Sequence, residues 1–564
     1  MQRRLIECVP NFSEGRDLSV IERITAEIRA VDGAELLDVD PGKATNRTVV
    51  TFVGEPEVVI EAAVRAGRKA AELIDMSRHS GEHPRFGAMD VCPLVPISGV
   101  TMEETAAYAR QLAKRLGEEV GLTIYCYESA ASTPERKNLA TVRSGEYEGL
   151  QDKLKDPRWK PDFGPAKFNS RSGATAVGAR DFLIAYNVNL NTTSTRRANA
   201  IAFDVREKGR QKREGNPITG PMVKDAAGKV VWIPGTLKAV KAIGWFIEEY
   251  GVAQISMNLT DIAVTPLHVA FDEVCEKARA RGLRVTGSEL VGLVPKRALL
   301  DAGEYFLRKQ QRSLGVSETE LIKIAVKSLG LDDLAPFDPR QKVIEFVLED
   351  REKRERLVDL TLRGFVEETA GESPAPGGGS VAATLGALGA ALGTMVANLS
   401  SHKPGWDERW EEFSDLASRG KRCHEELLAL VDADTDAFNG ILAAFRLPQG
   451  SAEEKAAREL AVQAATLRAI EVPFRIMEVA RESLDVIGEA AREGNPASIS
   501  DAGVGALCAR SAVLGAFLNV RINSKDLADK AAVRDFEERG AAIAKESERL
   551  ERQVLELVEA KIRS

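Results

Sequence analysis

Two of the five histidines of the chain, His79 and His83, lie within five positions of each other in the stretch 77–92, SRHSGEHPRFGAMDVC. An imidazole takes up and releases a proton near neutral pH, so this pair suggests acid–base chemistry. The charges of Glu82 and Asp90 can orient a ring and shift its proton affinity. The alternative is a polar loop with ordinary surface histidines.

The elements around this stretch predict where the histidines lie. Apolar residues recur at helical spacing over 56–75, and 91–97 is a short apolar strand, so the histidines belong to a helix-to-strand loop. Residues 5–97 as a whole have the order strand, helix, strand, strand, helix, strand. This order predicts a ferredoxin-like unit, with two helices on one face of an antiparallel sheet. A capping box at Thr101 then starts a further helix, and LTIYCY adds one more strand.

The same order of elements recurs between residues 181 and 290, which predicts a second, related α/β subdomain. Its long connection, 207–235, is rich in turn formers and basic residues. Such a run is usually a solvated loop, and the alternative is that its cations attract a polyanionic tail. From about residue 317 the strand signals fade, and a helical domain is expected.

The composition narrows the class of protein. A net charge of -8 argues against a general nucleic-acid binder. The six cysteines show no metal-binding spacing, which favours reduced thiols, no metal and a cytoplasmic location. The start of the chain lacks the pattern of a secretory signal. The uncharged segment 381–397 is rich in Ala and Gly and fits a buried helix better than a membrane span.

The chain contains several long motifs. In its first part these are LIECVPNFSEGR at 5–16, DVDPGKATNRTVVTFVG at 38–54, GEHPRFGAMDVCP at 81–93 and GSELVGLVP at 287–295. In its last part they are SPAPGGGSVAATLGALGAALG, FRLPQGSAEEK and NPASISDAGVGAL. The first set resembles the transferase part, and the second set the cyclodeaminase part, of the formiminotransferase-cyclodeaminase family. The resemblance covers nearly the whole chain.

The resemblance and the pattern of elements together predict an α+β N-terminal half of two ferredoxin-like subdomains, followed by an all-α helical-bundle domain. We expect a formiminotransferase N-terminal subdomain at 1–180 and its C-terminal subdomain at 181–330. A linker at 331–355 and a cyclodeaminase domain at 356–564 complete the chain.

The family's catalytic histidine maps onto His83. Formimino transfer needs a base for the incoming amine and an acid for the departing one, and one imidazole can serve both steps. The aspartate of the DVD motif maps onto Asp40, expected to assist, although a turn cap before Pro41 explains it equally well. Relatives carry a glutamine where this chain has Glu289, and an ionised carboxylate accepts hydrogen bonds but cannot donate them.

Two folate-binding stretches of the family match 164–173, GPAKFNSRSG, and 235–244, GTLKAVKAIG. Glycine would let a flat pterin approach the backbone, and the cations would offset glutamate carboxylates. The co-substrate implied is tetrahydrofolate, expected to be polyglutamylated. The residues carried over are Gly164, Lys167, Arg171, Gly173, Gly235, Lys238, Lys241 and Gly244.

The segment LVDADTDAF holds the candidate acid of the cyclodeaminase part. Leu427, Val431, Asp434 and Phe438 recur at steps of four and three, so Asp434 points into an apolar helix face. A buried carboxyl tends to stay protonated, as a general acid must. Asp434 is the candidate and Asp432 the second choice. The alternative is a buried cap or interhelix hydrogen bond.

The resemblance implies formimino transfer between N-formimino-L-glutamate and tetrahydrofolate, then cyclisation to 5,10-methenyltetrahydrofolate with loss of ammonia. A nearer alternative gives the C-terminal half methenyltetrahydrofolate cyclohydrolase activity. A non-catalytic folate-binding scaffold is the alternative from another class. The expected partners are these small molecules and further copies of the chain in a homo-oligomer built from dimers, with no nucleic acid and no membrane.

Overall fold

The chain forms two compact units. The computed structural model describes residues 4–42, 46–81, 85–216, 219–248, 250–351, 356–373 and 375–563. One unit comprises Met1–Ala298 with Leu329–Asp350, and the other comprises Leu299–Ser328 with Arg351–Ser564. The finer domain boundaries expected from the sequence stay predictions. The expected class, an α/β half followed by a helical half, is confirmed.

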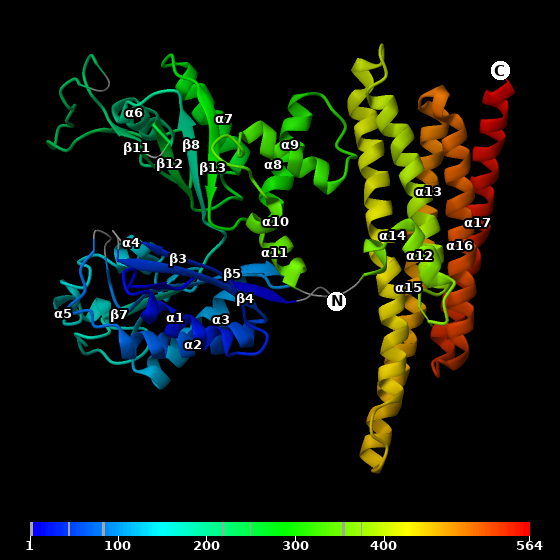
Figure 1. Cartoon of the computed structure of the whole chain (residues 1–564), viewed down its shortest axis with the longest axis horizontal. Helices are drawn as coiled ribbons and strands as arrows, with labels where there is room; N and C mark the ends of the chain where they lie inside the picture. Colours follow the sequence, from blue (N-terminus) through cyan, green and yellow to red (C-terminus); the bar gives the residue numbers. More distant parts are fainter. Residues whose placement is uncertain are drawn as a thin grey trace. The chain divides into compact units, whose positions relative to one another are not determined.

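The first unit begins with a seven-stranded sheet (Figure 1). Its strands are β1 (Leu5–Cys8), β2 (Asn11–Phe12), β3 (Glu35–Gly42), β4 (Arg47–Gly54), β5 (Met89–Ser98), β6 (Thr123–Glu128) and β7 (Ala174–Ala179). The long helices of this part are α1 (Leu18–Arg29), α2 (Pro56–Leu73) and α3 (Met102–Arg115). Between β6 and β7 lie the short helices α4 (Leu139–Val142) and α5 (Leu150–Lys153).

The elements from β1 to β5 form the expected ferredoxin-like unit, with the short strand β2 in addition. β1 pairs antiparallel with both β4 and β5, and β3 pairs with the outer edge of β4. Apolar residues of α1, α2 and α3 share one core with alternate residues of the strands, and Figure 1 shows these helices together on one side of the sheet. The predicted capping box of Thr101 and Glu104 starts α3. On the other face, a second apolar cluster joins β5, β6 and β7 to α4 and α5.

The strand β7 was not predicted. The sequence suggested that LTIYCY, now β6, extends the sheet directly, but β7 pairs parallel with both β5 and β6 and separates them. Its residues are all buried and include small ones, so they show no apolar–polar alternation. A strand of this kind is recognised only from its neighbours.

The second subdomain has a four-stranded antiparallel sheet in the order β11-β12-β8-β13. Its elements are β8 (Ile184–Leu190), α6 (Thr195–Val205), β11 (Val240–Ile247), β12 (Val252–Leu259), α7 (Leu267–Arg279) and β13 (Val285–Val291). The first strand lies between the third and the fourth, as in the first subdomain, so the expected repeat of element order is confirmed. In the connection before β11, β9 (Arg210–Gln211) and β10 (Trp232–Ile233) form a small separate sheet.

The segment 329–350 returns to this unit. It contains α10 (Pro339–Lys342) and the start of α11 (Ile344–Arg351). The Glu345 carboxylate accepts a hydrogen bond from the Lys296 backbone at 2.8 Å. Burial raises the pKa of Glu7 on β1 to about 7; the charge of Arg180 lowers it, and Glu345 raises it further. The last segment of the unit thus brings a charged side chain near the buried Glu7 of β1.

The second unit is helical. Its helices are α8 (Lys296–Lys309), α9 (Glu318–Leu329), α12 (Leu362–Thr369), α13 (Gly378–Ser401), α14 (Trp410–Phe445), α15 (Ala452–Glu493), α16 (Ile499–Asn523) and α17 (Lys530–Arg563). The loop between α8 and α9 docks on the bundle, since Ser313 donates to Asn398 on α13 at 2.6 Å and Leu314 donates to Ser414 on α14 at 3.1 Å. Figure 1 shows the ends of α14 and α15 projecting beyond the other long helices.

The glycines of α13 allow close helix packing, as predicted. A side chain at Gly389 would come within 2.8 Å of the Gly505 carbonyl oxygen on α16, and one at Gly393 within 2.8 Å of Ile487 on α15. Two segments, α13 and the region 496–526, are long and apolar enough to cross a membrane by length and composition. Both pack against other helices of the bundle, and such core helices pass the same test.

Candidate active sites

The loop that carries the histidines is anchored at both ends. The guanidinium of Arg85 donates to the backbone carbonyls of Met76, at 3.2 Å, and of His79. It also pairs with Glu148 and lies 5.1 Å from the ring centre of Tyr147. Arg85 thereby ties itself to the start of the loop, at Met76 and His79. The tip itself, with the predicted catalytic His83, lies outside the described residues.

Asn46 holds this loop beside the turn that follows Asp40. Its amide donates to the Ser80 carbonyl at 2.9 Å, its own carbonyl lies 2.7 Å from His79 Nε2, and its side-chain oxygen accepts from the Gly15 backbone at 3.0 Å. Burial lowers the pKa of His79, which favours a neutral ring. Asp40 is exposed on the edge strand β3. The structure thus brings the segments of Asp40 and of the histidine loop together.

Three motifs distant in sequence meet through their backbones. Ser13 donates to the carbonyls of Ala88, at 2.9 Å, and Gly87, at 2.8 Å. Ala88 in turn donates to the Ser172 carbonyl at 2.9 Å, and Gly87 forms a β-bridge with Gly173. The first predicted folate stretch therefore lies directly against the histidine loop.

The glycines of the folate stretches lie close to the protein backbone. A side chain at Gly164 would come within 1.9 Å of the Leu122 carbonyl oxygen, and one at Gly173 within 2.4 Å of that of Phe86. Gly235 is equally close to backbone, and Gly244 would meet the α6 backbone at 2.3 Å. These close contacts alone require glycine at the four positions, and the expected contact with a pterin stays a prediction. The four cations of these stretches, Lys167, Arg171, Lys238 and Lys241, are exposed.

A buried charged cluster lies close to these motifs. The Asp90 side chain is fully buried and pairs with Arg47, and with Arg143 at 2.9 Å. Burial, and then the charge of Arg143, lowers the pKa of Arg47 to about 9. Asp90 Oδ1 accepts no hydrogen bond from the described residues. The sequence offered Asp90 only as a charge near the histidines; Arg47 lies in the DVD motif segment, and nothing marked Arg143.

Glu289 lies in a polar network on the second sheet. Its carboxylate accepts from the Asn187 amide at 3.2 Å and from the Tyr250 hydroxyl at 3.4 Å. Both neighbours donate, as an ionised carboxylate requires. A glutamate therefore satisfies this position without the donor group that a glutamine would supply.

The helical unit places Asp434 at the glycine-rich start of α13. Its Oδ2 accepts from the Ser380 hydroxyl at 3.2 Å, and a side chain at Gly379 would come within 2.1 Å of its Oδ1. Burial raises its pKa, although hydrogen bonds from Ser380 oppose this. Leu427 and Val431 on the same face are buried, whereas Phe438 is 38% exposed. Asp434 therefore lies on the largely buried face of α14, next to the start of α13.

Asp432, the second choice, has a structural partner. Its Oδ1 accepts a hydrogen bond from the Leu357 backbone at 2.7 Å, which ties the turn η4 (Leu357–Asp359) to α14. This bond occupies one carboxylate oxygen. Of the two, Asp434 has the burial expected of a group that remains protonated.

Comparison with known proteins covers both units. Family models match residues 5–180 (formiminotransferase domain, N-terminal subdomain), 185–349 (formiminotransferase domain) and 361–542 (formiminotransferase-cyclodeaminase). The mouse (Mus musculus) formimidoyltransferase-cyclodeaminase is 44% identical over 93% of this chain and 93% of its own length. The chain belongs to the formimidoyltransferase-cyclodeaminase family.

Shorter relatives match the two halves of this family member separately. A glutamate formimidoyltransferase of Thermoplasma acidophilum is 42% identical over 54% of this chain and 92% of its own length. A methenyltetrahydrofolate cyclohydrolase of Methylorubrum extorquens is 34% identical over 36% of this chain and 97% of its own length. Within the described part of the chain, no group of three or more His, Cys, Asp or Glu side chains is placed to hold a metal ion.

Proposed function

We propose that the protein transfers the formimino group between N-formimino-L-glutamate and tetrahydrofolate and then cyclises 5-formiminotetrahydrofolate to 5,10-methenyltetrahydrofolate, releasing ammonia. The observation that carries the second step is the half-buried carboxyl of Asp434 at the start of α13. Full-length relatives named for both activities support the pairing of the two steps in one chain.

In the transferase site, we assign His83 as the base for the incoming amine and the acid for the departing one. Asp40 assists from the edge strand β3. Arg47 and Arg143 share the carboxylate of Asp90, and the charge of Glu146 also acts on Arg143. We assign these two guanidinium groups to the attraction of the substrate's carboxylates. Glu289 acts as a hydrogen-bond acceptor.

In the cyclodeaminase site, N10 of the folate attacks the formimino carbon, and the C–N bond to the departing nitrogen breaks. That nitrogen gains two protons and leaves as ammonia: one is the proton that N10 loses, and Asp434 in its protonated form supplies the other. Ser380 orients the carboxyl, and Gly379 leaves room for it. Asp432 holds the neighbouring turn instead.

The folate is polyglutamylated, and its glutamate carboxylates interact with the exposed cations Lys167, Arg171, Lys238 and Lys241. The chemistry needs no metal. We place the protein in the cytoplasm, without a nucleic-acid or membrane partner. The net charge of -8 and cysteines without metal spacing support this assignment.

The decisive experiment mixes the purified protein with tetrahydrofolate and N-formimino-L-glutamate and measures methenyltetrahydrofolate by absorbance and ammonia in parallel. Equal amounts of both products are expected. If 5-formiminotetrahydrofolate forms without ammonia, the C-terminal unit is not a cyclodeaminase, and hydrolysis of methenyltetrahydrofolate tests the cyclohydrolase alternative. If neither product forms while folate binds, the protein is a folate-binding scaffold.

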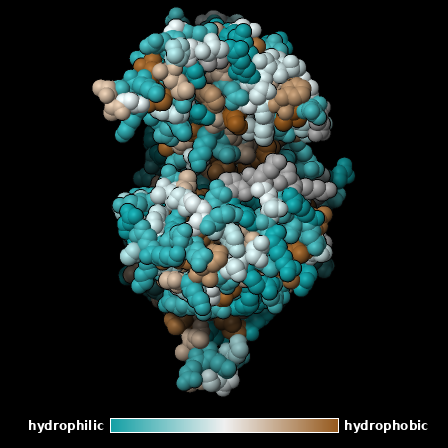
Figure 2. All heavy atoms as spheres, turned by 90° about the vertical axis from the view of Figure 1, so that its left-hand side faces the viewer, coloured by the Kyte–Doolittle hydropathy of each residue, from teal (hydrophilic) through white to brown (hydrophobic). Residues whose placement is uncertain are grey.

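We further propose that α13 and α16 form a dimer interface. Both carry exposed apolar side chains at steps of three, four or seven residues, a spacing that keeps them on one helix face. On α13 these are Leu388, Met395 and Leu399, and on α16 Val504, Leu507, Leu514, Leu518 and Ile522. The α13 helix contains no charged residue. In contrast, the face of the molecule in Figure 2 is mainly hydrophilic, with apolar atoms only in small patches.

The two apolar stripes lie on the same side of the helix pair. Gly515 packs near Ala382, and Gly389 packs near Gly505, so the helices run antiparallel. In each helix, exposed apolar residues directly precede residues that contact the other helix, as Leu388 precedes Gly389 and Val504 precedes Gly505. One residue corresponds to a rotation of about 100° around the helix axis. Because the helices run antiparallel, this rotation points both stripes to the same side of the pair. Because the surface is apolar and formed by two antiparallel helices, a second copy of the same surface is the partner that matches it.

Replacing Leu518 by aspartate is expected to convert the oligomer to smaller species, because a charge would be buried at the interface. Light scattering after size-exclusion chromatography measures the mass. Leu460→Asp on α15 is the control, since Leu460 is 72% exposed and Leu518 65%, and it lies outside the stripes. A monomeric wild-type protein would contradict the proposal, and one that sediments with lipid vesicles would instead assign the surface to a membrane.

A further inference from the structure

A pocket lined by four arginines lies against α6 in the second subdomain. Its volume is about 530 Å³, and its cationic residues are Arg196, Arg206, Arg210 and Arg213. Trp232 adds an aromatic wall. None of the described residues that line it is acidic. A pocket of this composition is suited to a ligand with several negative charges.

The pocket is built by an insertion in the fold. Arg196 and Phe203 lie seven residues apart on α6 and therefore share one helix face. The opposite wall comes from β9 and β10, within the connection 206–239 between α6 and β11. A connection between a helix and the next strand of an α/β unit usually needs only two to six residues or so. The extra residues serve to form this wall.

Two of the arginines are held in place by backbone carbonyls. Arg206 Nε donates to the Gly209 carbonyl at 2.9 Å, and its guanidinium lies 4.0 Å from the ring centre of Phe203. Arg213 donates to the Gly220 carbonyl at 2.7 Å. These contacts orient the guanidinium groups without neutralising them. The site is therefore organised before a ligand binds.

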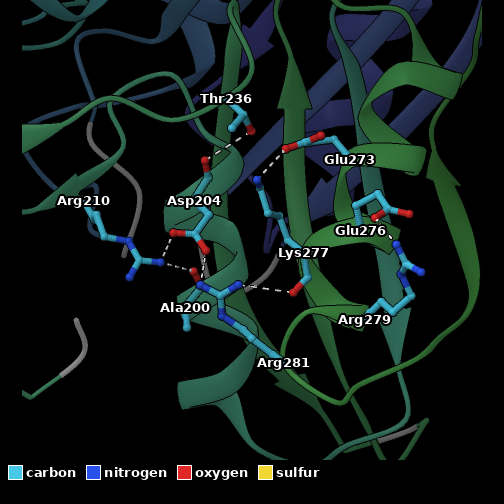
Figure 3. A network of polar contacts seen from close by, with 9 residues as sticks. All are labelled: Ala200, Asp204, Arg210, Thr236, Glu273, Glu276, Lys277, Arg279 and Arg281. Carbon is cyan, nitrogen blue, oxygen red and sulfur yellow. Dashed lines mark hydrogen bonds and ion pairs between the residues drawn. The ribbon is translucent and has the colours of Figure 1, made fainter. Parts of the chain in front are cut away.

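Arg210, the fourth arginine of the pocket, takes part in a largely buried network of ion pairs. Asp204 accepts from both Arg210 and Arg281, and Arg210 also donates to the Ala200 carbonyl at 2.9 Å (Figure 3). Asp204 thus offsets the charge of Arg210. Burial lowers the pKa of Arg206, so its cation is poorly solvated and gains from an added anion.

The other three arginines keep their charge available. In the described part of the chain, no acidic side chain forms an ion pair with Arg196, Arg206 or Arg213. The pocket therefore carries uncompensated positive charge in a protein whose net charge is -8. A concentration of one charge sign in a concave site raises the local concentration of the opposite ion.

The pocket wall is joined to the second predicted folate stretch. The Arg206 carbonyl oxygen fills the space where Gly235 lacks a side chain, at 1.9 Å, and Arg206 Nη1 donates to the Ala242 carbonyl at 3.4 Å. The Thr236 backbone donates to the Asp204 carbonyl at 2.9 Å. Arg206 therefore both lines the pocket and contacts the stretch 235–244, so a ligand in the pocket lies next to this stretch.

We propose that this pocket binds a multiply charged anion, whose carboxylate or phosphate oxygens are bound by Arg196, Arg206 and Arg213 beside Trp232. Two sources share this chemistry: the glutamyl tail of a folate held by the adjacent stretch, and a free di- or polyanion. Only the first source rests on the proposed function.

Inorganic pyrophosphate and γ-linked tetraglutamate are titrated separately into the full-length protein, with Trp232 fluorescence as the signal. Trp232→Phe identifies the part of the signal that comes from the pocket. The double variant R206Q/R213Q is expected to raise the Kd of the bound probe by at least about tenfold, because hydrogen bonds to charged groups contribute that much. The single variant Arg213→Gln leaves the Arg206 contacts intact and is expected to raise the Kd by a smaller factor. It replaces the double variant in the test if the double variant does not fold.

The matched control is Arg279→Gln on α7, whose exposed guanidinium pairs with Glu276 outside the pocket at 2.7 Å (Figure 3). It is expected to leave both titrations unchanged. If the tail is the ligand, tetraglutamate binds, and R206Q/R213Q raises the KM of tetraglutamyl but not of monoglutamyl tetrahydrofolate. If a free anion is the ligand, pyrophosphate binds and both KM values stay as in wild type.

The proposal is overturned if wild-type protein binds neither probe, or if binding survives in R206Q/R213Q. Because the titrations need no turnover, a failure of the proposed enzymatic function leaves this outcome unaffected, and the two failures are distinguishable.

Discussion

Replacing His83 by alanine is expected to slow formimino transfer by about 10²–10⁴-fold, the usual contribution of a positioned acid–base group. The imidazole takes the proton of the incoming amine and returns it to the departing one, and alanine can do neither. Transfer is measured as 5-formiminotetrahydrofolate formed from N-formimino-L-glutamate and tetrahydrofolate. Cyclisation of added 5-formiminotetrahydrofolate is expected to continue at the wild-type rate.

His79→Ala is the matched control for this prediction. His79 lies in the same loop, but its ring is half-buried and its Nε2 lies 2.7 Å from the Asn46 carbonyl. We expect a smaller loss of transfer, through a less well-held loop. If His83→Ala keeps near-normal transfer while His79→Ala does not, the roles of the two histidines must be exchanged.

Replacing Asp434 by asparagine is expected to stop ammonia release and to make 5-formiminotetrahydrofolate accumulate, while transfer continues. Asparagine has nearly the size of aspartate and can still accept the hydrogen bond from Ser380. It cannot give a proton to the departing nitrogen. The loss should again be about 10²–10⁴-fold. Ammonia and methenyltetrahydrofolate are measured together from added 5-formiminotetrahydrofolate.

The pH profile separates this role from a structural one. Burial raises the pKa of Asp434, so its protonated form persists to higher pH than for an ordinary aspartate. Cyclisation should therefore fall as pH rises through this raised pKa, and the residual activity of Asp434→Asn should lack that fall. A purely structural role would lower the rate equally at every pH.

Asp432→Asn is the comparison variant. It weakens the acceptor for the Leu357 backbone and leaves Asp434 in place, so we expect reduced stability with ammonia release retained. The opposite pattern, with release lost in Asp432→Asn and kept in Asp434→Asn, would assign the acid to Asp432.

The sequence predicted most elements of the fold because their signals are local. Apolar spacing of two or about 3.6 residues identified the strands and helices of both ferredoxin-like units, and the capping box located the start of α3. The same periodicity predicted that Asp434 lies on the apolar face of α14, and its carboxyl is half-buried in the structure. A short apolar segment such as β7, which shows no alternation, gave no comparable signal.

The sequence by itself therefore determined the order of elements, the repeat of the ferredoxin-like unit and the face of Asp434, since each depends on residues a few positions apart. Only the tertiary structure decided which distant groups meet. The pairing of Asp90 with Arg143, the fit of Asp434 against Gly379 and the arginine pocket beside α6 all join residues far apart in the chain. The physical reason is that such contacts depend on strand pairing and helix packing, which no local spacing encodes.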